Sequence, residues 1–188
     1  MWRKISEWLH KISTGWLVII GLVINLIFAG FVLPAQAAQA EVVSQGAGTP
    51  DLSFYYSVDD LYEMAETYGE EGRQAYIRAR FTFDLLWPIV YTLFLATSLS
   101  WLFRCGFSPG SGWRMANLVP ILGMIFDYLE NSSTSLVMLR YPARTPLVDF
   151  LAPLFTAIKW VFVGGSFVLL LIGMAAWLIS LVTKRPEA

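Results

Sequence analysis

Apolar residues gather in four long runs that polar segments separate. The runs cover residues 15–33, 83–103, 115–139 and 150–182. A helix needs about 20 mostly apolar residues to cross a hydrocarbon core of about 30 Å, and each run is at least close to that length. The pattern therefore predicts an all-α fold, an integral membrane bundle of four transmembrane helices that forms a single domain over residues 1–188. The fourth run is longer than a span requires, so its helix must tilt, bend or begin outside the hydrocarbon.

The segment between the first two runs, residues 34–82, is the only long polar connection, and we expect it to be an extracytoplasmic loop with its own helices. Its first part, residues 35–50, is rich in small residues and is expected to be a flexible linker. Ser57 followed by Asp60 has the spacing of a capping box, and apolar residues then recur at helical spacing over residues 58–68. The helix is interrupted by two glycines, Gly69 and Gly72. Its charged face is expected to be solvated, or to contact a protein partner through residues 57–81.

The composition agrees with a membrane location. The chain is 56% hydrophobic and only 14% charged, whereas soluble domains carry about 25% charged residues. A formal net charge of -1 and the lack of any nucleic-acid motif exclude a nucleic-acid partner, so membrane lipid is the expected partner. No haem, iron–sulfur or nucleotide motif is present. With one histidine, His10, and one cysteine, Cys105, no metal site is predicted.

Basic residues that flank the runs predict the orientation. One side carries Arg3, Lys4, Lys11, Arg104, Arg114, Lys184 and Arg185. Because basic flanks favour the cytoplasm, both termini of this multi-pass protein are expected to be cytoplasmic. The other side carries a smaller set, Arg73, Arg78, Arg80, Arg140 and Arg144.

The first run has a second interpretation, a cleavable signal peptide. Alanines after the run form A-x-A patterns at Ala35, Ala37, Ala38 and Ala40. The run is longer than the usual signal core of about 7 to 15 residues, which favours a retained anchor. Both interpretations stay open at the level of the sequence.

The third run contains polar residues where an unpartnered charge costs several kcal/mol. Asp127, Glu130 and Asn131 are spaced i, i+3 and i+4, so they share one helical face, which we expect to point into the bundle. Lys159 in the fourth run lies at a similar depth, so a pair between Lys159 and Glu130 or Asp127 is predicted, with Thr156 one turn away. Such a cluster serves either as a functional pocket or as a structural lock between helices.

The second run begins with a further polar stripe. Asp84, Pro88 and Tyr91 lie on one helical face. Pro88 cannot donate to the carbonyl of Asp84, and the resulting kink can open a cavity lined by Asp84, Trp87 and Tyr91. The alternative is structural, with Asp84 at the headgroup level and Arg80 one turn before it.

Taken together, these positions resemble those of a group of uncharacterised bacterial four-span membrane proteins. The segments that carry the resemblance are Tyr62 to Gly72-Arg73 and Tyr76, Asp84-x-x-x-Pro88-x-x-Tyr91, Asp127-x-x-Glu130-Asn131, Arg140-x-Pro142 and Thr156-x-x-Lys159. The resemblance implies a four-helix architecture with a helical outer loop, and it transfers no activity.

Three functions are compatible with these features. The first is an inner-membrane protein whose polar cluster binds a lipid-like or small amphipathic ligand, with Lys159 on an anionic head group and aromatic residues on the apolar part. The second is an enzyme that uses Asp84, Asp127 and Glu130 as acid and base or as ligands of a divalent cation on a lipid substrate. The third is an accessory or assembly protein in which the cluster only fixes helix register.

Overall fold

The structure, a computed structural model, describes residues 1–183. That part of the chain is helical without any strand, which confirms the all-α prediction. The helices are α1 (Trp2–Ile12), α2 (Gly15–Ile27), α3 (Leu33–Ser44), α4 (Val58–Arg80), α5 (Phe83–Gly106), α6 (Val119–Arg140) and α7 (Pro146–Thr183). A π-helical segment occupies Phe28–Val32, and two 3-10 helices occupy Pro50–Leu52 and Gly112–Leu118. Lys184 and Arg185, which entered the orientation argument, lie outside the described residues.

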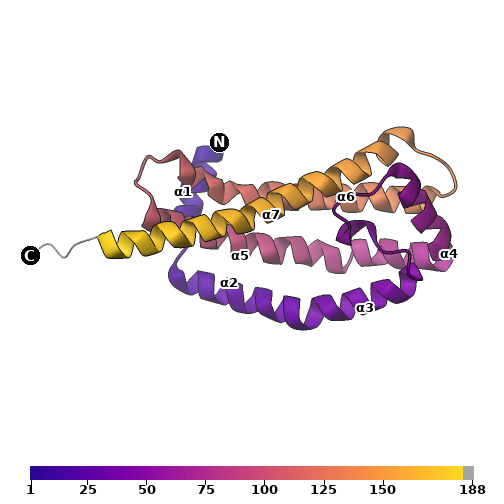
Figure 1. Cartoon of the computed structure of the whole chain (residues 1–188), viewed down its shortest axis with the longest axis horizontal. Helices are drawn as coiled ribbons and strands as arrows, with labels where there is room; N and C mark the ends of the chain where they lie inside the picture. The colour runs from indigo at the N-terminus through magenta and orange to yellow at the C-terminus, as the bar shows by residue number, and fades with distance from the viewer. Residues whose placement is uncertain (184–188) are drawn as a thin grey trace, which may run out of the picture.

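The long helices run side by side along one axis of an elongated bundle (Figure 1). The continuous helix α2–α3 lies along α5, while α6 and α7 pack together on the other side of α5. α4 lies at one end of the bundle, and α1 and the end of α7 lie at the other. The chain therefore passes along the bundle in alternating directions, as the order of apolar runs predicts.

Three helical segments are long and apolar enough to cross a membrane, which indicates a membrane protein. They are Gly15–Ser44, Val58–Gly106 and Pro146–Thr183. The third predicted span, residues 115–139, is not among them. It corresponds to α6, whose carboxylates and hydroxyl residues lower its mean hydropathy.

The distribution of side chains is that of a protein in an apolar solvent. Large apolar residues are exposed along α2 and α7, for example Trp16 at 68% and Leu171 at 62%. Polar residues fill the interior, where Glu130 and Thr156 are each 0% exposed. Exposed apolar surface on this scale is stable only where something apolar covers it. The inward orientation of the polar residues confirms the prediction for the face that carries Asp127, Glu130 and Asn131.

The first span is longer than predicted because the expected flexible linker is largely helical. α3 continues to Ser44, and the chain leaves the helix only at Gln45, which has a φ of 51°. The prediction of a flexible stretch over residues 35–50 was therefore wrong for its first ten residues. Alanine is the best helix former, so a run of small residues rich in alanine favours a helix over a linker. A π-turn at Phe28–Val32 joins α2 to α3 just before Pro34, which cannot donate a helical hydrogen bond.

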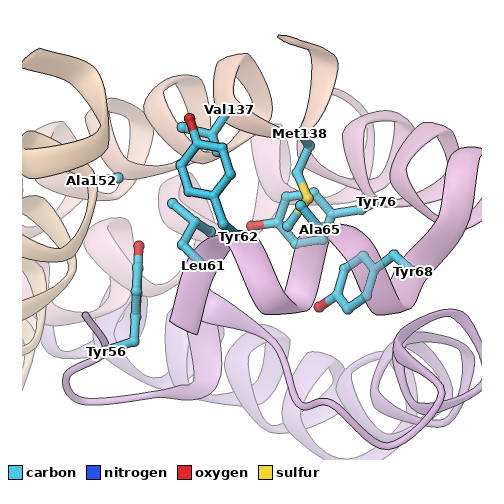
Figure 2. Packing of buried hydrophobic residues seen from close by; sticks show 9 residues of the cluster. All are labelled: Tyr56, Leu61, Tyr62, Ala65, Tyr68, Tyr76, Val137, Met138 and Ala152. Carbon is cyan, nitrogen blue, oxygen red and sulfur yellow. The ribbon is translucent and has the colours of Figure 1, made fainter. Parts of the chain in front are cut away.

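α4 confirms the helix predicted between the first two spans. The Ser57 side chain accepts from the Asp60 amide, and the Asp60 carboxylate accepts from the Ser57 amide at 2.7 Å, which completes the capping box. The helix breaks at Gly69, whose φ of 63° suits glycine, but it continues through Gly72, so the second predicted interruption was wrong. The apolar face of α4 is buried against α6 and the start of α7 (Figure 2). Tyr62 fixes this contact, since its hydroxyl donates to the Asp149 carboxylate at 3.0 Å.

Glycines allow the spans to approach closely. A Cβ atom on Gly173 of α7 would lie 2.6 Å from the Phe103 ring of α5, and one on Gly123 of α6 would lie 3.0 Å from Val163 of α7. The contact between α6 and α7 is the most extensive in the bundle. This confirms the predicted contact between the third and fourth apolar runs.

α1 is held against the end of α5 by side chains that reach its backbone and its polar face. Arg104 donates to the carbonyl oxygens of His10 and, at 2.9 Å, Ser13. The Ser6 hydroxyl donates to the Asn117 side chain at 2.8 Å. Trp2 and Trp8 stay exposed, so α1 is an amphipathic helix docked at one end of the bundle.

Candidate functional site

A cavity of about 360 Å³ lies between the α2–α3 helix and the rest of the bundle. The α2–α3 helix supplies one wall, and α4, α5, α6, α7 and the loop before α4 supply the others. Five charged residues line the cavity: Asp51, Arg80, Asp84, Asp127 and Lys159. Much of the remaining lining is apolar or aromatic. The cavity therefore combines charged groups with an apolar surface inside a membrane protein.

Arg80 is the centre of the first charged group. Its guanidinium lies 2.9 Å from a carboxylate oxygen of Asp51 and 2.9 Å from one of Asp84, and it also covers the ring of Tyr76. Burial raises the pKa of the Asp51 carboxyl, but the positive charges of Arg80 and Lys159 lower it by a larger amount. The pKa of Asp51 therefore lies below its ordinary value. Arg80 thus anchors the loop before α4 to the start of α5.

Lys159 belongs to the second charged group. Its ammonium pairs with the Glu130 carboxylate and lies 3.4 Å from the carbonyl oxygen of Asp51. The Thr156 hydroxyl donates to the other Glu130 oxygen at 2.8 Å, and the Tyr56 hydroxyl lies 3.0 Å from that of Thr156. Because the Thr156 hydroxyl donates to Glu130, it accepts from the Tyr56 hydroxyl, so each of these three side chains has a hydrogen-bond partner. The predicted pair between Lys159 and Glu130 is confirmed.

Asp127 lies between these two groups and has no basic partner within ion-pair distance in the described chain. Its carboxylate accepts from the Tyr91 hydroxyl at 3.0 Å and from the Asn131 amide at 3.3 Å. Two hydrogen bonds from neutral donors hold its orientation but supply no opposite charge. Asp127 is the carboxylate of this region whose charge is least compensated.

The eight residues that the sequence singles out come together, but not all in the same way. Five of them line the cavity: Asp84, Trp87, Tyr91, Asp127 and Lys159. Glu130 and Thr156 lie behind Lys159 in a closed network, and Asn131 supports Asp127. The predicted cavity at the Asp84, Trp87 and Tyr91 face is present, with Pro88 inside α5. A binding role for these residues stays a prediction.

The sequence alone missed the part of the site that comes from the loop between α3 and α4. Thr49 and Asp51 line the cavity, and Tyr56 completes the network of Glu130. These residues stand in an irregular segment without periodicity. No signal in the sequence marked them as part of the site.

The α2–α3 wall was missed as well. Gln36, Ala40 and Val43 line the cavity from the segment that was expected to be a flexible linker. The error about the linker therefore hid one side of the site.

Comparisons of the chain with protein-family models, curated proteins and solved structures found no match. The resemblance to bacterial four-span proteins consequently stays a prediction, and the function has to be argued from the cavity itself.

Proposed function

We propose that this chain is a four-span protein of the bacterial inner membrane that binds a lipid-like or small amphipathic ligand in its cavity. α6 serves as the remaining span, because its polar face is turned toward α5 and α7. Both termini lie in the cytoplasm, since Arg3, Lys11, Arg104 and Arg114 lie together at the end of the bundle where α1 docks. α4 and the loop before it then lie on the extracytoplasmic side, as a helical cover over the cavity.

The observation that carries this proposal is the order of residues along the cavity. On α7, Lys159 is followed one and two turns later by Val163 and Phe167, which also line it. On α5, Asp84 is followed by Trp87 and Tyr91. Apart from Asp127, which the Tyr91 hydroxyl contacts, the charged residues thus lie at the end of the cavity near α4, and the apolar residues lie toward the middle of the bundle. A ligand with a polar head and an apolar tail matches this gradient, and about 360 Å³ is in the usual range for small-molecule sites.

The structural lock explains only part of the polar cluster. Glu130, Thr156 and Tyr56 are buried and mutually bonded behind Lys159, which supports a role in fixing helix register. Asp84 and Asp127 instead lie on the cavity wall. The accessory function is therefore a second candidate, in which the exposed charged face of α4, within residues 57–81, contacts a protein partner. The enzyme hypothesis stays secondary. Its divalent-cation form lacks a ligand set, since among residues 1–183 no group of three or more acidic, histidine or cysteine side chains has the placement to hold a metal ion. Its acid–base form would use the carboxylates of Asp84 and Asp127 on the cavity wall.

A quenching experiment tests ligand binding. ω-Bromooctanol is a neutral amphiphile, and its bromine quenches nearby indoles such as those of Trp87 and Trp160, which line the cavity. In a maltoside detergent we expect saturable quenching of the wild type. Ala40→Phe, which fills part of the cavity, should remove most of the saturable component. Ala38→Phe is the matched control, since Ala38 is exposed on the same helix and does not line the cavity.

Two outcomes would contradict the proposal. One is quenching of the wild type that rises linearly without saturation, as expected from partition into micelles. The other is equal saturable quenching in Ala40→Phe and Ala38→Phe, which would place the probe elsewhere.

A further inference from the structure

We infer that the head group of the cavity ligand carries a positive charge, with an ammonium group as its simplest form. The inference rests on the proposed function and replaces the anionic head group expected from the sequence. It depends on the balance of charges, on the partners of each charged group and on the aromatic residues beside them.

The charges around the cavity do not balance. Asp51, Asp84 and Asp127 line it, and Glu130 adjoins it through Lys159. The only basic side chains that line it within the described chain are Arg80 and Lys159. With all groups ionised the set carries two surplus negative charges. A cationic ligand supplies the missing charge, whereas an anionic ligand increases the imbalance.

Both basic side chains are already engaged. Arg80 contacts two carboxylates at 2.9 Å each, and Lys159 pairs with a fully buried carboxylate. An anionic head group would have to compete with these partners in a region of low dielectric, where separating an ion pair is costly. Each basic side chain that lines the cavity in the described chain therefore already has a carboxylate beside it, and none is left free for an anion.

Two acceptor atoms of residues at the charged end of the cavity have no hydrogen-bond partner within residues 1–183. In the described chain, the Asp51 Oδ1 and Thr49 Oγ1 atoms are buried and accept no hydrogen bond. Thr49 is 6% exposed and lines the cavity beside Asp51. Leaving buried polar atoms without partners is unfavourable, and an ammonium group has three donors to offer them. The unpartnered Asn25 Nδ2 also lines the cavity, but that amide carries no net charge.

Aromatic rings stand next to the carboxylates. Trp87 lies between Phe28 and Tyr91, with ring centroids 6.0 Å and 5.8 Å away, and both Trp87 and Tyr91 line the cavity with Asp127. Aromatic faces attract cations, and this attraction increases where water is excluded. Carboxylates with flanking aromatic rings are thus suited to an organic cation that carries an apolar chain.

The experiment compares three probes that share the same brominated chain: ω-bromooctylammonium, ω-bromooctanol and ω-bromooctanoate. Binding is measured by quenching at pH 7 in a maltoside detergent, which carries no charge. We expect the ammonium probe to bind the wild type about tenfold more tightly than the carboxylate probe. Asp127→Asn keeps the shape of the side chain and its contact with Tyr91. This variant should weaken the binding of the ammonium probe about tenfold and leave the binding of the octanol probe unchanged.

Glu63→Gln is the matched control, because it removes one negative charge from the exposed face of α4, away from the cavity. It should leave the binding of all three probes unchanged. Equal losses in Asp127→Asn and Glu63→Gln would overturn the inference, since they would reflect general attraction to an acidic surface. Equal or tighter binding of the carboxylate probe would also overturn it, while the proposed function would stand. If none of the three probes binds saturably, the proposed function itself fails.

Discussion

The buried pair between Lys159 and Glu130 leads to the prediction that can be worked out furthest. In Lys159→Met the Glu130 carboxylate, which is 0% exposed, keeps only the hydroxyl of Thr156. Removing one partner of a buried ion pair costs about 3 to 5 kcal/mol, because the other charge is left uncompensated. We expect this loss in the free energy of unfolding. Thr97→Val is the control, and it should change the free energy of unfolding little, since the Thr97 hydroxyl bonds only to carbonyl oxygens of its own helix.

The second step is a double-mutant cycle. Lys159→Met combined with Glu130→Gln leaves no buried charge at this position, so the double variant should recover more than half of the loss. The assay is reversible unfolding in mixed micelles of a maltoside and dodecyl sulfate, followed by circular dichroism. A lone Glu130 escapes the cost by binding a proton. The deficit of Lys159→Met should therefore shrink as the pH falls, whereas the double variant should show no such change.

Two results would refute this reasoning. A loss below about 1 kcal/mol in Lys159→Met that does not grow as the pH is raised would show that Glu130 is not a buried, charged partner. A double variant whose loss equals the sum of the single losses would show that the two residues do not interact.

Further predictions concern packing, the α4 cap and the loop. Gly173→Val should destabilise the protein by about 1 to 3 kcal/mol, since its side chain would overlap the Phe103 ring; this is measured by the same unfolding assay. Ser57→Ala should cost about 1 kcal/mol and increase amide exchange in the first turn of α4. Because Asp51 has a lowered pKa, it stabilises the fold above pH 3.8 and loses this effect as the pH falls. The stability advantage of the wild type over Asp51→Asn should accordingly disappear on acidification below that pH. Intact mass spectrometry should find the α2–α3 helix retained in the mature protein, since this helix forms one wall of the cavity.

Each of these has a contradicting outcome. A Gly173→Val variant as stable as Gly164→Val, whose added Cβ meets nothing within 4 Å, would contradict the close packing of α5 and α7. Exchange in Ser57→Ala that matches the wild type would show that the cap contributes nothing. A constant difference between wild type and Asp51→Asn across the pH range would exclude an ionised role for Asp51. A mature chain that starts after residue 40 would remove the α2–α3 wall.

The site could be predicted from the sequence wherever its residues lie on regular helices. Asp127, Glu130 and Asn131 share a face by helical periodicity alone, and an ionisable residue in an apolar run must find a partner, which pointed to Lys159. A cavity at the face of Asp84, Trp87 and Tyr91 was predicted from the hydrogen bond that proline cannot make, and these three residues do line the cavity. The sequence could not decide whether the polar cluster forms a binding pocket or a structural lock between helices. That choice depends on which side chains line the cavity and which bond only to one another.

The sequence by itself determined the all-α architecture, the membrane environment and the inward-facing polar cluster. Each of these follows from local periodicity and from the cost of exposing a charge to lipid, which act within one helix or between two. The tertiary structure alone decided that Asp51 and Thr49 complete the site and that the α2–α3 helix forms its wall. These contacts join segments far apart in the chain, and no periodic signal marks them. Their formation depends on how the loop before α4 folds back over the bundle.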